Sequence, residues 1–283
     1  MKKLLCIWLI IIFAIGIVPF ASAEAEKTLK PMTVNISFGG EIIEMDTEEY
    51  ALRVLLAESE ACKSDEAKKA LSVAARSVGA YFSLFGCKHE DFDACADGDC
   101  CIRLADISKF KKEEIDAAKA IVKSTYGTAL VADSCPALAL FTLCSGSSTR
   151  QSEIFSYLTP VARKEKCEIH KTEIKYTVAE LYSRLGVDSG KEESFIYDDN
   201  GKCKLGFVGG RLFSGEDIAS RLGLKSNELL VTVETDKVIA TSYGVGHGYG
   251  LDLCNSSELA SAGKGYREIL QTYFPKLTIN KIY

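Results

Sequence analysis

The spacing of apolar residues divides the chain into short strands and helices. Residues 32–45 alternate in polarity around Gly39–Gly40, which predicts two strands joined by a tight turn. A helix is predicted to start near Asp46 and to run through residues 50–57. Ser64 is a favourable helix N-cap, and after it apolar residues recur at helical spacing until Gly86.

The remainder of the chain mixes the two periodicities. Further helices are predicted at residues 113–125, about 177–186, 214–222 and 266–274. Strands are predicted at 128–132, 137–143, 229–233 and 237–241, with another hairpin around Asp199-Asn200-Gly201. The pattern predicts an α+β fold. We expect a single compact domain over residues 24–283, with helices packed on mainly antiparallel strands and a less regular middle insertion at about 160–225.

Residues 1–23 have the form of a secretory signal. Lys2 and Lys3 precede an apolar run from Leu4 to Val18, and Ala21-Ser22-Ala23 has the small–x–small form of a cleavage site. A spanning helix needs roughly 20 apolar residues, so the run is short unless the following residues extend it. The sequence predicts export, with this segment either cleaved as a signal peptide or kept as an N-terminal membrane anchor.

Charge and cysteine content narrow the function classes. The net charge is −5 and the chain has no basic tract interleaved with aromatic residues, so a nucleic-acid partner is not expected. Ten of the eleven cysteines lie beyond the N-terminal segment. Export permits disulfides, and this even number would allow complete pairing.

One stretch concentrates these cysteines. Residues 87–101, CKHEDFDACADGDCC, hold four of them together with His89. Zinc binds thiolate, imidazole and carboxylate ligands, all of which this stretch supplies. A zinc site, a disulfide and free thiols are therefore all open interpretations of the residues themselves.

A first candidate for catalysis lies between two predicted helices. Glu58 ends an apolar helix, where desolvation could raise the pKa of its carboxyl and let it act as a general acid; a solvated helix-end Glu is the simpler interpretation. Arg76 interrupts the apolar run AARSV and is either a buried ion-pair partner or a binder of anions and hydroxyls. Lys69 lies two helical turns before Arg76, on the same face.

Two further segments carry candidate chemistry. In FTLCSGSSTR, residues 141–150, a strand ends in small polar residues that could line a groove or form an ordinary serine-rich loop. In YGVGHGYGLDL, residues 243–253, glycines flank His247 and allow a ligand to approach the backbone closely. We expect His247 to face a cleft.

Taken together and in order, these segments resemble the sporulation stage II protein D family and the related amidase-enhancer domain. Tyr50, Glu58 and the helix EAKKALSVAARS of residues 66–77 resemble the family's first motif. SGSST, residues 145–149, resembles its S-G-G-x-T motif. GHGYGL at 246–251 and the stretch 263–275 resemble its C-terminal motifs, so that the resemblance runs from about residue 32 to 283.

The resemblance implies a peptidoglycan lytic transglycosylase that cleaves between N-acetylmuramic acid and N-acetylglucosamine and prefers strands stripped of stem peptides. It implies export to the cell surface, or anchoring at the septum between forespore and mother cell, during engulfment. The implied partners are glycan strands, a cell-wall amidase and other engulfment proteins. No cofactor is implied for catalysis. The alternative is a non-catalytic, wall-binding enhancer of a separate N-acetylmuramoyl-L-alanine amidase.

The resemblance also assigns residues. The family's catalytic Glu falls on Glu58. The expected substrate-binding residues are Lys69, Arg76, Ser145, Thr149, His247 and Gly248. The family's cysteine loop can hold a structural zinc, and the matching positions are His89, Cys95, Asp99 and Cys100. Cys87 or Cys101 could substitute, although adjacent Cys100 and Cys101 are expected to point apart, so that at most one is a ligand.

The sequence departs from the family pattern at several positions. Ser147 stands for the second glycine of the middle motif, and Asp252-Leu253 replaces the usual Ser-Gln. Asp252 is expected at the edge of the cleft. Ser59–Glu60 follows the catalytic position in place of Met-Pro, which makes Glu60 a rival acid.

Overall fold

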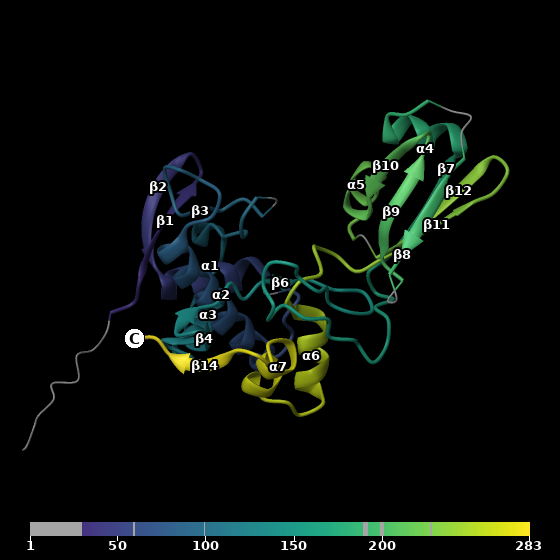
Figure 1. Cartoon of the computed structure of the whole chain (residues 1–283). Helices are drawn as coiled ribbons and strands as arrows, with labels where there is room; N and C mark the ends of the chain where they lie inside the picture. The colour runs from purple at the N-terminus through teal and green to yellow at the C-terminus, as the bar shows by residue number, and fades with distance from the viewer. Residues whose placement is uncertain (1–29, 59, 99, 189–191, 199–200, 227) are drawn as a thin grey trace, which may run out of the picture.

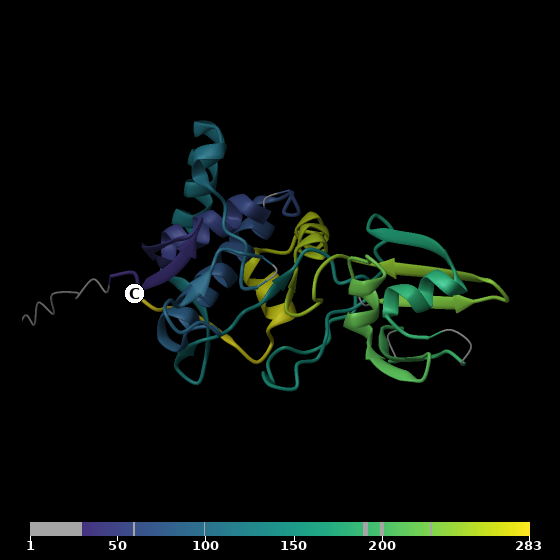
Figure 2. The same cartoon turned by 90° about the horizontal axis from the view of Figure 1, so that it is seen from above.

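The chain forms two lobes with separate hydrophobic cores. The structure is a computed structural model that describes residues 30–58, 60–98, 100–188, 192–198, 201–226 and 228–283. Both lobes are visible in two perpendicular views, with residues from the two ends of the chain in the first lobe and the middle of the chain in the second (Figures 1 and 2). Each lobe buries its own set of apolar side chains.

The first lobe is organised around two helices, α1 (Thr47–Glu58) and α2 (Asp65–Phe85). The Ser64 hydroxyl accepts a hydrogen bond from the Ala67 amide at 3.2 Å and so caps α2, as its residue type predicted. The small residues of α2 are buried along most of its length, which lets α1 and the neighbouring strands approach closely. This packing fixes the C-terminal end of α1.

A small sheet covers one end of these helices. β1 (Thr33–Phe38) and β2 (Glu41–Asp46) form the predicted antiparallel hairpin, and both turn glycines have positive φ. β3 (Ala94–Cys95) joins the other edge of β1 in parallel, with Ile36 paired to Ala94. Because β3 belongs to the cysteine-rich loop, this pairing docks the loop against the first lobe.

The C-terminal part of the chain returns to the first lobe (Figure 1). Its elements are α6 (Leu253–Ser261), α7 (Tyr266–Tyr273) and β14 (Thr278–Lys281). β14 pairs with β4 (Thr128–Ala132), and β4 pairs on its other side with β5 (Cys135–Pro136). In the chain, β4 is preceded by a 3-10 turn, η1 (Ile107–Lys109), and by α3 (Lys112–Ser124). β13 (Leu251–Asp252) pairs in parallel with β6 (Phe141–Thr142), and this pairing brings the segments 141–150 and 243–253 together.

The second lobe has two three-stranded antiparallel sheets and two short helices. Its elements are β7 (Lys171–Thr177), α4 (Val178–Leu185), β8 (Ser194–Tyr197), β9 (Cys203–Val208), β10 (Arg211–Ser214), α5 (Gly215–Arg221), β11 (Leu229–Val233) and β12 (Lys237–Tyr243). The sheets have the orders β11-β12-β7 and β10-β9-β8. Leu181, Leu185 and Ile218, from the two helices, are fully buried between them.

The predicted α+β class is confirmed. The predicted strand 137–143 is shorter in the structure, where only Phe141–Thr142 pairs with another strand. Helix α6 was not predicted, because Asn255 and Ser256 are polar yet buried and obscure its apolar face. The predicted signal or anchor at 1–23 lies outside the described residues, as do Asp199 and Asn200 of the predicted hairpin. Within the described ranges, no helix has the length and apolar character needed to cross a membrane.

Candidate active site

Glu58 occupies the last position of α1. Its side chain is 12% exposed, and its Oε1 lies 3.0 Å from Nη2 of Arg103, whose own side chain is 61% exposed. A second contact, 3.3 Å from Nε of Arg103, makes the pairing two-pronged. Because carbonyl groups end a helix at its C-terminus, a carboxylate there is unfavourable by itself. Arg103 supplies the compensating positive charge.

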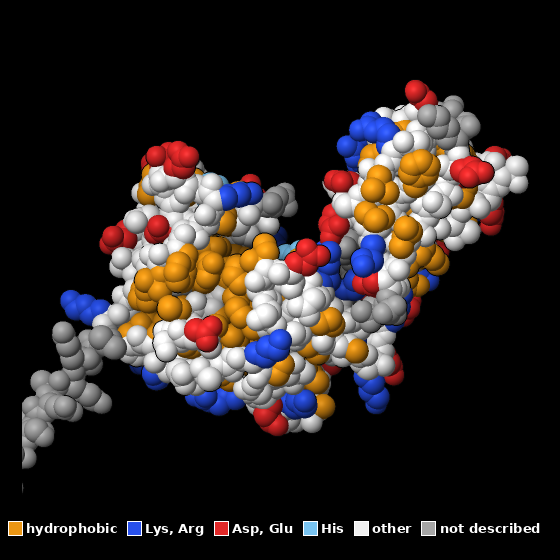
Figure 3. Space-filling view, in the orientation of Figure 1, with side chains coloured by type: hydrophobic (Ala, Val, Ile, Leu, Met, Phe, Trp, Pro, Cys, Tyr) orange, Lys and Arg blue, Asp and Glu red, His pale blue; other side chains and the backbone are white. Residues whose placement is uncertain are grey.

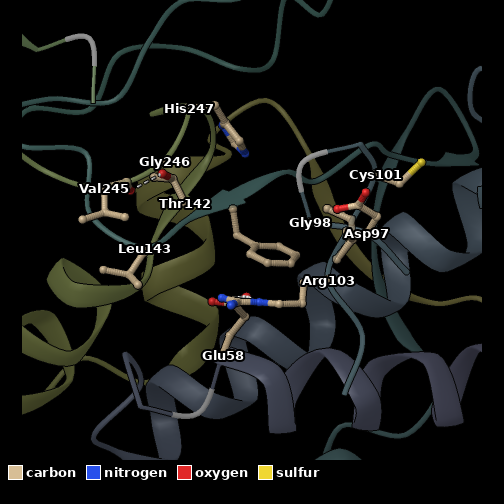
Figure 4. A pocket seen from close by; sticks show the side chains of 12 residues that line it. Glu58, Asp97, Gly98, Cys101, Arg103, Thr142, Leu143, Val245, Gly246 and His247 are labelled. Atoms are coloured by element: carbon tan, nitrogen blue, oxygen red, sulfur yellow. Dashed lines mark hydrogen bonds and ion pairs between the residues drawn. The ribbon is translucent and has the colours of Figure 1, made fainter. Parts of the chain in front are cut away.

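A pocket of about 410 Å³ opens beside this ion pair (Figure 4). Glu58 and Arg103 lie on one side of it and His247 on the opposite side. Phe141, Thr142 and Leu143 of the middle segment also line it, together with Asp97, Gly98, Cys101, Ile102, Val245 and Gly246. Three segments that are far apart in sequence therefore converge on one cavity, and the cysteine-rich loop forms part of its wall.

His247 is solvent-exposed at the pocket and packs with its ring centre 5.7 Å from that of Tyr249. Its Nδ1 accepts a hydrogen bond from the Tyr249 amide at 3.0 Å. Although the residue reaches the surface, protein groups packed around the ring reduce its hydration and lower its pKa below the usual value, and the nearby positive charge of Arg150 adds to that effect. His247 is therefore a neutral imidazole near pH 7, with the hydrogen on Nε2.

Gly248 shapes the pocket through its backbone. Its φ is 78°, and an added Cβ would come within 3.2 Å of the Arg150 side chain. Its amide donates to Oγ1 of Thr142 at 3.2 Å, and its carbonyl accepts from the Arg150 amide at 2.8 Å. Gly248 does not line the pocket, but it holds the segment that carries His247 against the middle segment.

Ser145 and Thr149, which were expected to bind substrate, are buried and engaged within the protein. The amide and hydroxyl of Ser145 donate to Asp252 at 2.9 and 2.6 Å. Thr149 donates from its hydroxyl to the Thr159 carbonyl at 3.1 Å, and its oxygen accepts from the Val161 amide at 2.7 Å. Neither side chain lines the pocket. Both fix the backbone of the segment behind it.

Arg76 has the first of its two predicted roles, as a buried ion-pair partner. Its side chain is completely buried and holds the two carboxylate oxygens of Glu48 at 2.7 and 2.6 Å. It also donates to the Thr128 and Val122 carbonyls at 2.9 and 3.2 Å. A glycan in solvent cannot reach this guanidinium, so its expected role in binding substrate is corrected to one of joining α1, α2 and β4.

Lys69 also lies away from the pocket. Its ammonium pairs with Glu66 one turn earlier at 2.6 Å, and Glu66 in turn accepts from the Tyr266 amide at 2.7 Å. This partly exposed network links α2 to the start of α7. Lys69 therefore lies at the junction of α2 and α7 and does not line the cavity, where a substrate-binding residue was expected.

The two other expected carboxylates are also placed elsewhere. Asp252, expected at the cleft edge, is fully buried, where it caps α6 by accepting from the Asn255 amide at 2.8 Å and pairs with Arg163 at 3.1 Å. Burial behind these donors excludes it from the pocket. Glu60, the rival acid, lines a separate cavity beside α6. Glu58 is the glutamate that lines the first pocket, and Asp97 is the aspartate that does so.

The cysteine-rich loop gathers its candidate metal ligands. One atom from each of His89, Cys95, Cys100 and Cys101 lies within 4.8 Å of all the others. Nε2 of His89 is 3.4 Å from Sγ of Cys100 and 3.3 Å from Sγ of Cys101. Adjacent Cys100 and Cys101 therefore converge, which corrects the expectation that they point apart. Asp99, which was expected to be a ligand, lies outside the described residues, and the described cysteines form no disulfide.

Arg103 is the functional residue that the sequence analysis missed. It lies 45 positions from Glu58, and no periodicity links the two. The available signal was local, because an arginine stands between two apolar residues directly after the cysteine loop. Such an isolated charge calls for a partner, but the sequence does not identify the partner as Glu58.

Comparison with known proteins confirms the resemblance that the motifs predict. A family model described as Stage II sporulation protein matches residues 39–131. Stage II sporulation protein D of Bacillus subtilis (strain 168) is 24% identical over 325 aligned positions, which cover 99% of this chain and 94% of that protein. The protein of the same name from Bacillus amyloliquefaciens is 23% identical over 171 positions, covering 56% of this chain and 50% of that protein. The low identity is that of a divergent relative.

Proposed function

We propose that this divergent relative of the sporulation stage II protein D family is a lytic transglycosylase that cleaves peptidoglycan glycan strands. The observation that carries the proposal is the position of Glu58. It is the glutamate in the cavity where the three family-like segments converge, and its partner Arg103 comes from the loop that forms the cavity wall.

The chemistry requires one carboxyl group in two roles. Glu58 first donates a proton to the glycosidic oxygen as the bond to C1 of N-acetylmuramic acid breaks. The C6 hydroxyl of the same sugar then attacks C1, and the Glu58 carboxylate accepts the hydroxyl proton. The product is a 1,6-anhydro sugar. Because the substrate's own hydroxyl is the nucleophile, this reaction does not require the second carboxyl group that most glycoside hydrolases use.

His247 and Arg103 support this reaction from the pocket walls. Neutral His247 presents Nε2–H toward a neutral sugar hydroxyl or amide without adding a charge. Arg103 is largely exposed, so its side chain can swing away from Glu58 as a glycan enters. Asp97 offers a further acceptor for sugar hydroxyls at the wall of the pocket.

The decisive experiment digests glycan strands stripped of stem peptides and identifies the new chain ends. We expect 1,6-anhydro ends from the wild type and none from Glu58→Gln, which has nearly the same shape but cannot donate a proton. Glu60→Gln is the matched control and should retain activity, because Glu60 lines another cavity. Full activity of Glu58→Gln would refute the assignment, and reducing ends in place of anhydro ends would identify a hydrolase.

A second candidate function is supported by the Glu58–Arg103 pair itself. The Arg103 guanidinium lies 3.0 Å from the Glu58 carboxylate, so this oxygen is engaged in an ion pair and is not free to meet a glycosidic oxygen. The protein would then bind glycan and enhance a separate cell-wall amidase. In that case Glu58→Gln would leave amidase stimulation intact, and no anhydro ends would form with any variant.

We further propose a structural Zn²⁺ in the cysteine-rich loop, held by His89, Cys95, Cys100 and Cys101. A tetrahedral site with the usual zinc bond lengths separates nitrogen and sulfur ligands by about 3.5 Å, close to the 3.3 and 3.4 Å observed. The ion would fix the loop that presents Arg103 and take no part in proton transfer. We also propose that the protein is exported and acts at the forespore septum alongside a cell-wall amidase.

A further inference from the structure

A second group of thiols and an imidazole lies where the second lobe joins the first. Cys144 follows β6, and Cys254 lies in the first turn of α6. Cys167 and His170 belong to the segment that leads into β7. None of the four lies in the cysteine-rich loop or lines the pocket with Glu58.

Backbone hydrogen bonds fix these residues relative to one another. The Cys254 amide donates to the Leu143 carbonyl at 3.1 Å, directly before Cys144, and the Cys167 amide donates to the Gly146 carbonyl at 3.1 Å. Cys144 also pairs with Val245 across an isolated β-bridge. The convergence of the four residues therefore follows from the fold and not from side-chain rotamers alone.

Two of these side chains are buried, and Cys254 and His170 are half-buried. Sγ of Cys254 is 3.5 Å from Nε2 of His170, while Cys144 and Cys167 are 1% and 4% exposed. The backbone bonds from Cys254 to Leu143 and from Cys167 to Gly146 place Cys144 between these two cysteines, and His170 lies on the Cys254 side.

The composition of this group is that of a tetrahedral zinc site. Three thiolates and one imidazole form a common structural ligand set, and the 3.5 Å nitrogen–sulfur separation equals the edge of about 3.5 Å expected around zinc. Zinc with three thiolates carries one net negative charge, and Nη1 of Arg163 lies 3.8 Å from Sγ of Cys144 to offset it. No three of these four ligand atoms lie within 4.8 Å of one another, as those of the first cluster do, so cysteine χ1 rotations would have to bring them together around an ion.

We propose that Cys144, Cys167, His170 and Cys254 bind a second Zn²⁺, which ties the chain leading into the second lobe to the first. Each bound thiol releases its proton to solvent, and no oxidation state changes. The ion would clamp a segment that the structure otherwise holds to the first lobe by hydrogen bonds and ion pairs. This inference is independent of glycan cleavage, because it concerns metal content alone.

The test measures zinc per chain in full-length protein purified under reducing conditions with zinc supplied. We expect two equivalents in the wild type, one in Cys254→Ser, one in Cys95→Ser, and none in the double variant. Cys203→Ser is the matched control, because this buried cysteine of the second lobe belongs to neither cluster, and it should retain two. Cobalt loaded into Cys95→Ser should show thiolate charge-transfer bands that disappear in the double variant.

Two variants of His170 distinguish loss of the metal site from simple misfolding. His170→Ala keeps all three thiols and should lose the second ion to a chelator much faster, while His170→Cys restores a fourth ligand and should retain it. One zinc equivalent in the wild type that Cys254→Ser preserves would overturn the proposal. A disulfide from Cys144 to Cys167 or Cys254 in the zinc-supplied protein, found by non-reducing peptide mapping, would overturn it equally.

Discussion

The two lobes both have a well-buried core, yet they contribute unequally to the candidate chemistry. Every residue that lines the pocket with Glu58 comes from the first lobe or from residues 245–247, just after the second lobe ends. The space-filling view shows a notch between the lobes with basic side chains along its wall (Figure 3). Lys202 and Glu216 of the second lobe line another cavity, of about 570 Å³, together with Arg150 and Tyr249. A change in the core of the second lobe should therefore affect the stability of that lobe without altering the residues that line the pocket with Glu58.

The largest expected effect comes from Arg76→Met, which should destabilise the first lobe alone. Removing one partner of a buried pair leaves Glu48 uncompensated, at a cost of about 3–5 kcal/mol. Calorimetry should show one transition shifted to lower temperature while that of the second lobe stays in place. Lys69→Met is the control, because its partly exposed pair is worth about 1 kcal/mol or less. Equal shifts in both transitions would show that the lobes unfold together.

Leu181→Ala should produce the opposite pattern. Leu181 is fully buried in the second core, and such truncations cost about 2–5 kcal/mol. The second transition should fall to lower temperature, while the rate of the proposed glycan cleavage at 25 °C should be unchanged. Leu181→Met, with similar volume, should cost under about 1.5 kcal/mol. Loss of cleavage in folded Leu181→Ala protein would assign the second lobe a part in the chemistry.

The smallest effect concerns His247. Its folded-state pKa is lowered by loss of hydration and by Arg150, so Arg150→Gln should move it upward toward the usual value. The stability that the neutral ring contributes is fully present above about pH 6.5 and is lost as the pH falls toward the lowered pKa. NMR titration of the imidazole measures the shift, and His247→Gln assigns the signal. An unchanged titration would show that Arg150 does not act on the ring.

The comparison also explains what the sequence could predict. Periodicity identifies α1, α2 and the strand pair β11–β12 because their apolar residues face one core each. The flanking glycines predict that His247 faces a cleft, and the family resemblance selects Glu58; the fold then brings both residues to one pocket. Periodicity cannot choose between the two roles of Arg76, because the partner Glu48 lies 28 positions away. The convergence of Cys100 and Cys101 could not be predicted for a similar reason, since the backbone turn that aligns the two depends on the docked loop.

The chain enters and leaves the second lobe at nearly the same point. The Gly244 amide donates to the His170 carbonyl at 3.2 Å, so the ends of the segment 171–243 are already in contact. From the side of the first lobe, this whole segment acts as a long loop. The entropic cost of closing a loop rises only slowly with its length, so the size of the segment adds little to that cost. A relative could therefore exchange it for another module without breaking the path of the chain through the first lobe, provided that the contacts of Lys202, Glu216 and Glu228 with residues 147–150 were replaced. The second lobe is in this sense an insertion with its own core and a single point of attachment.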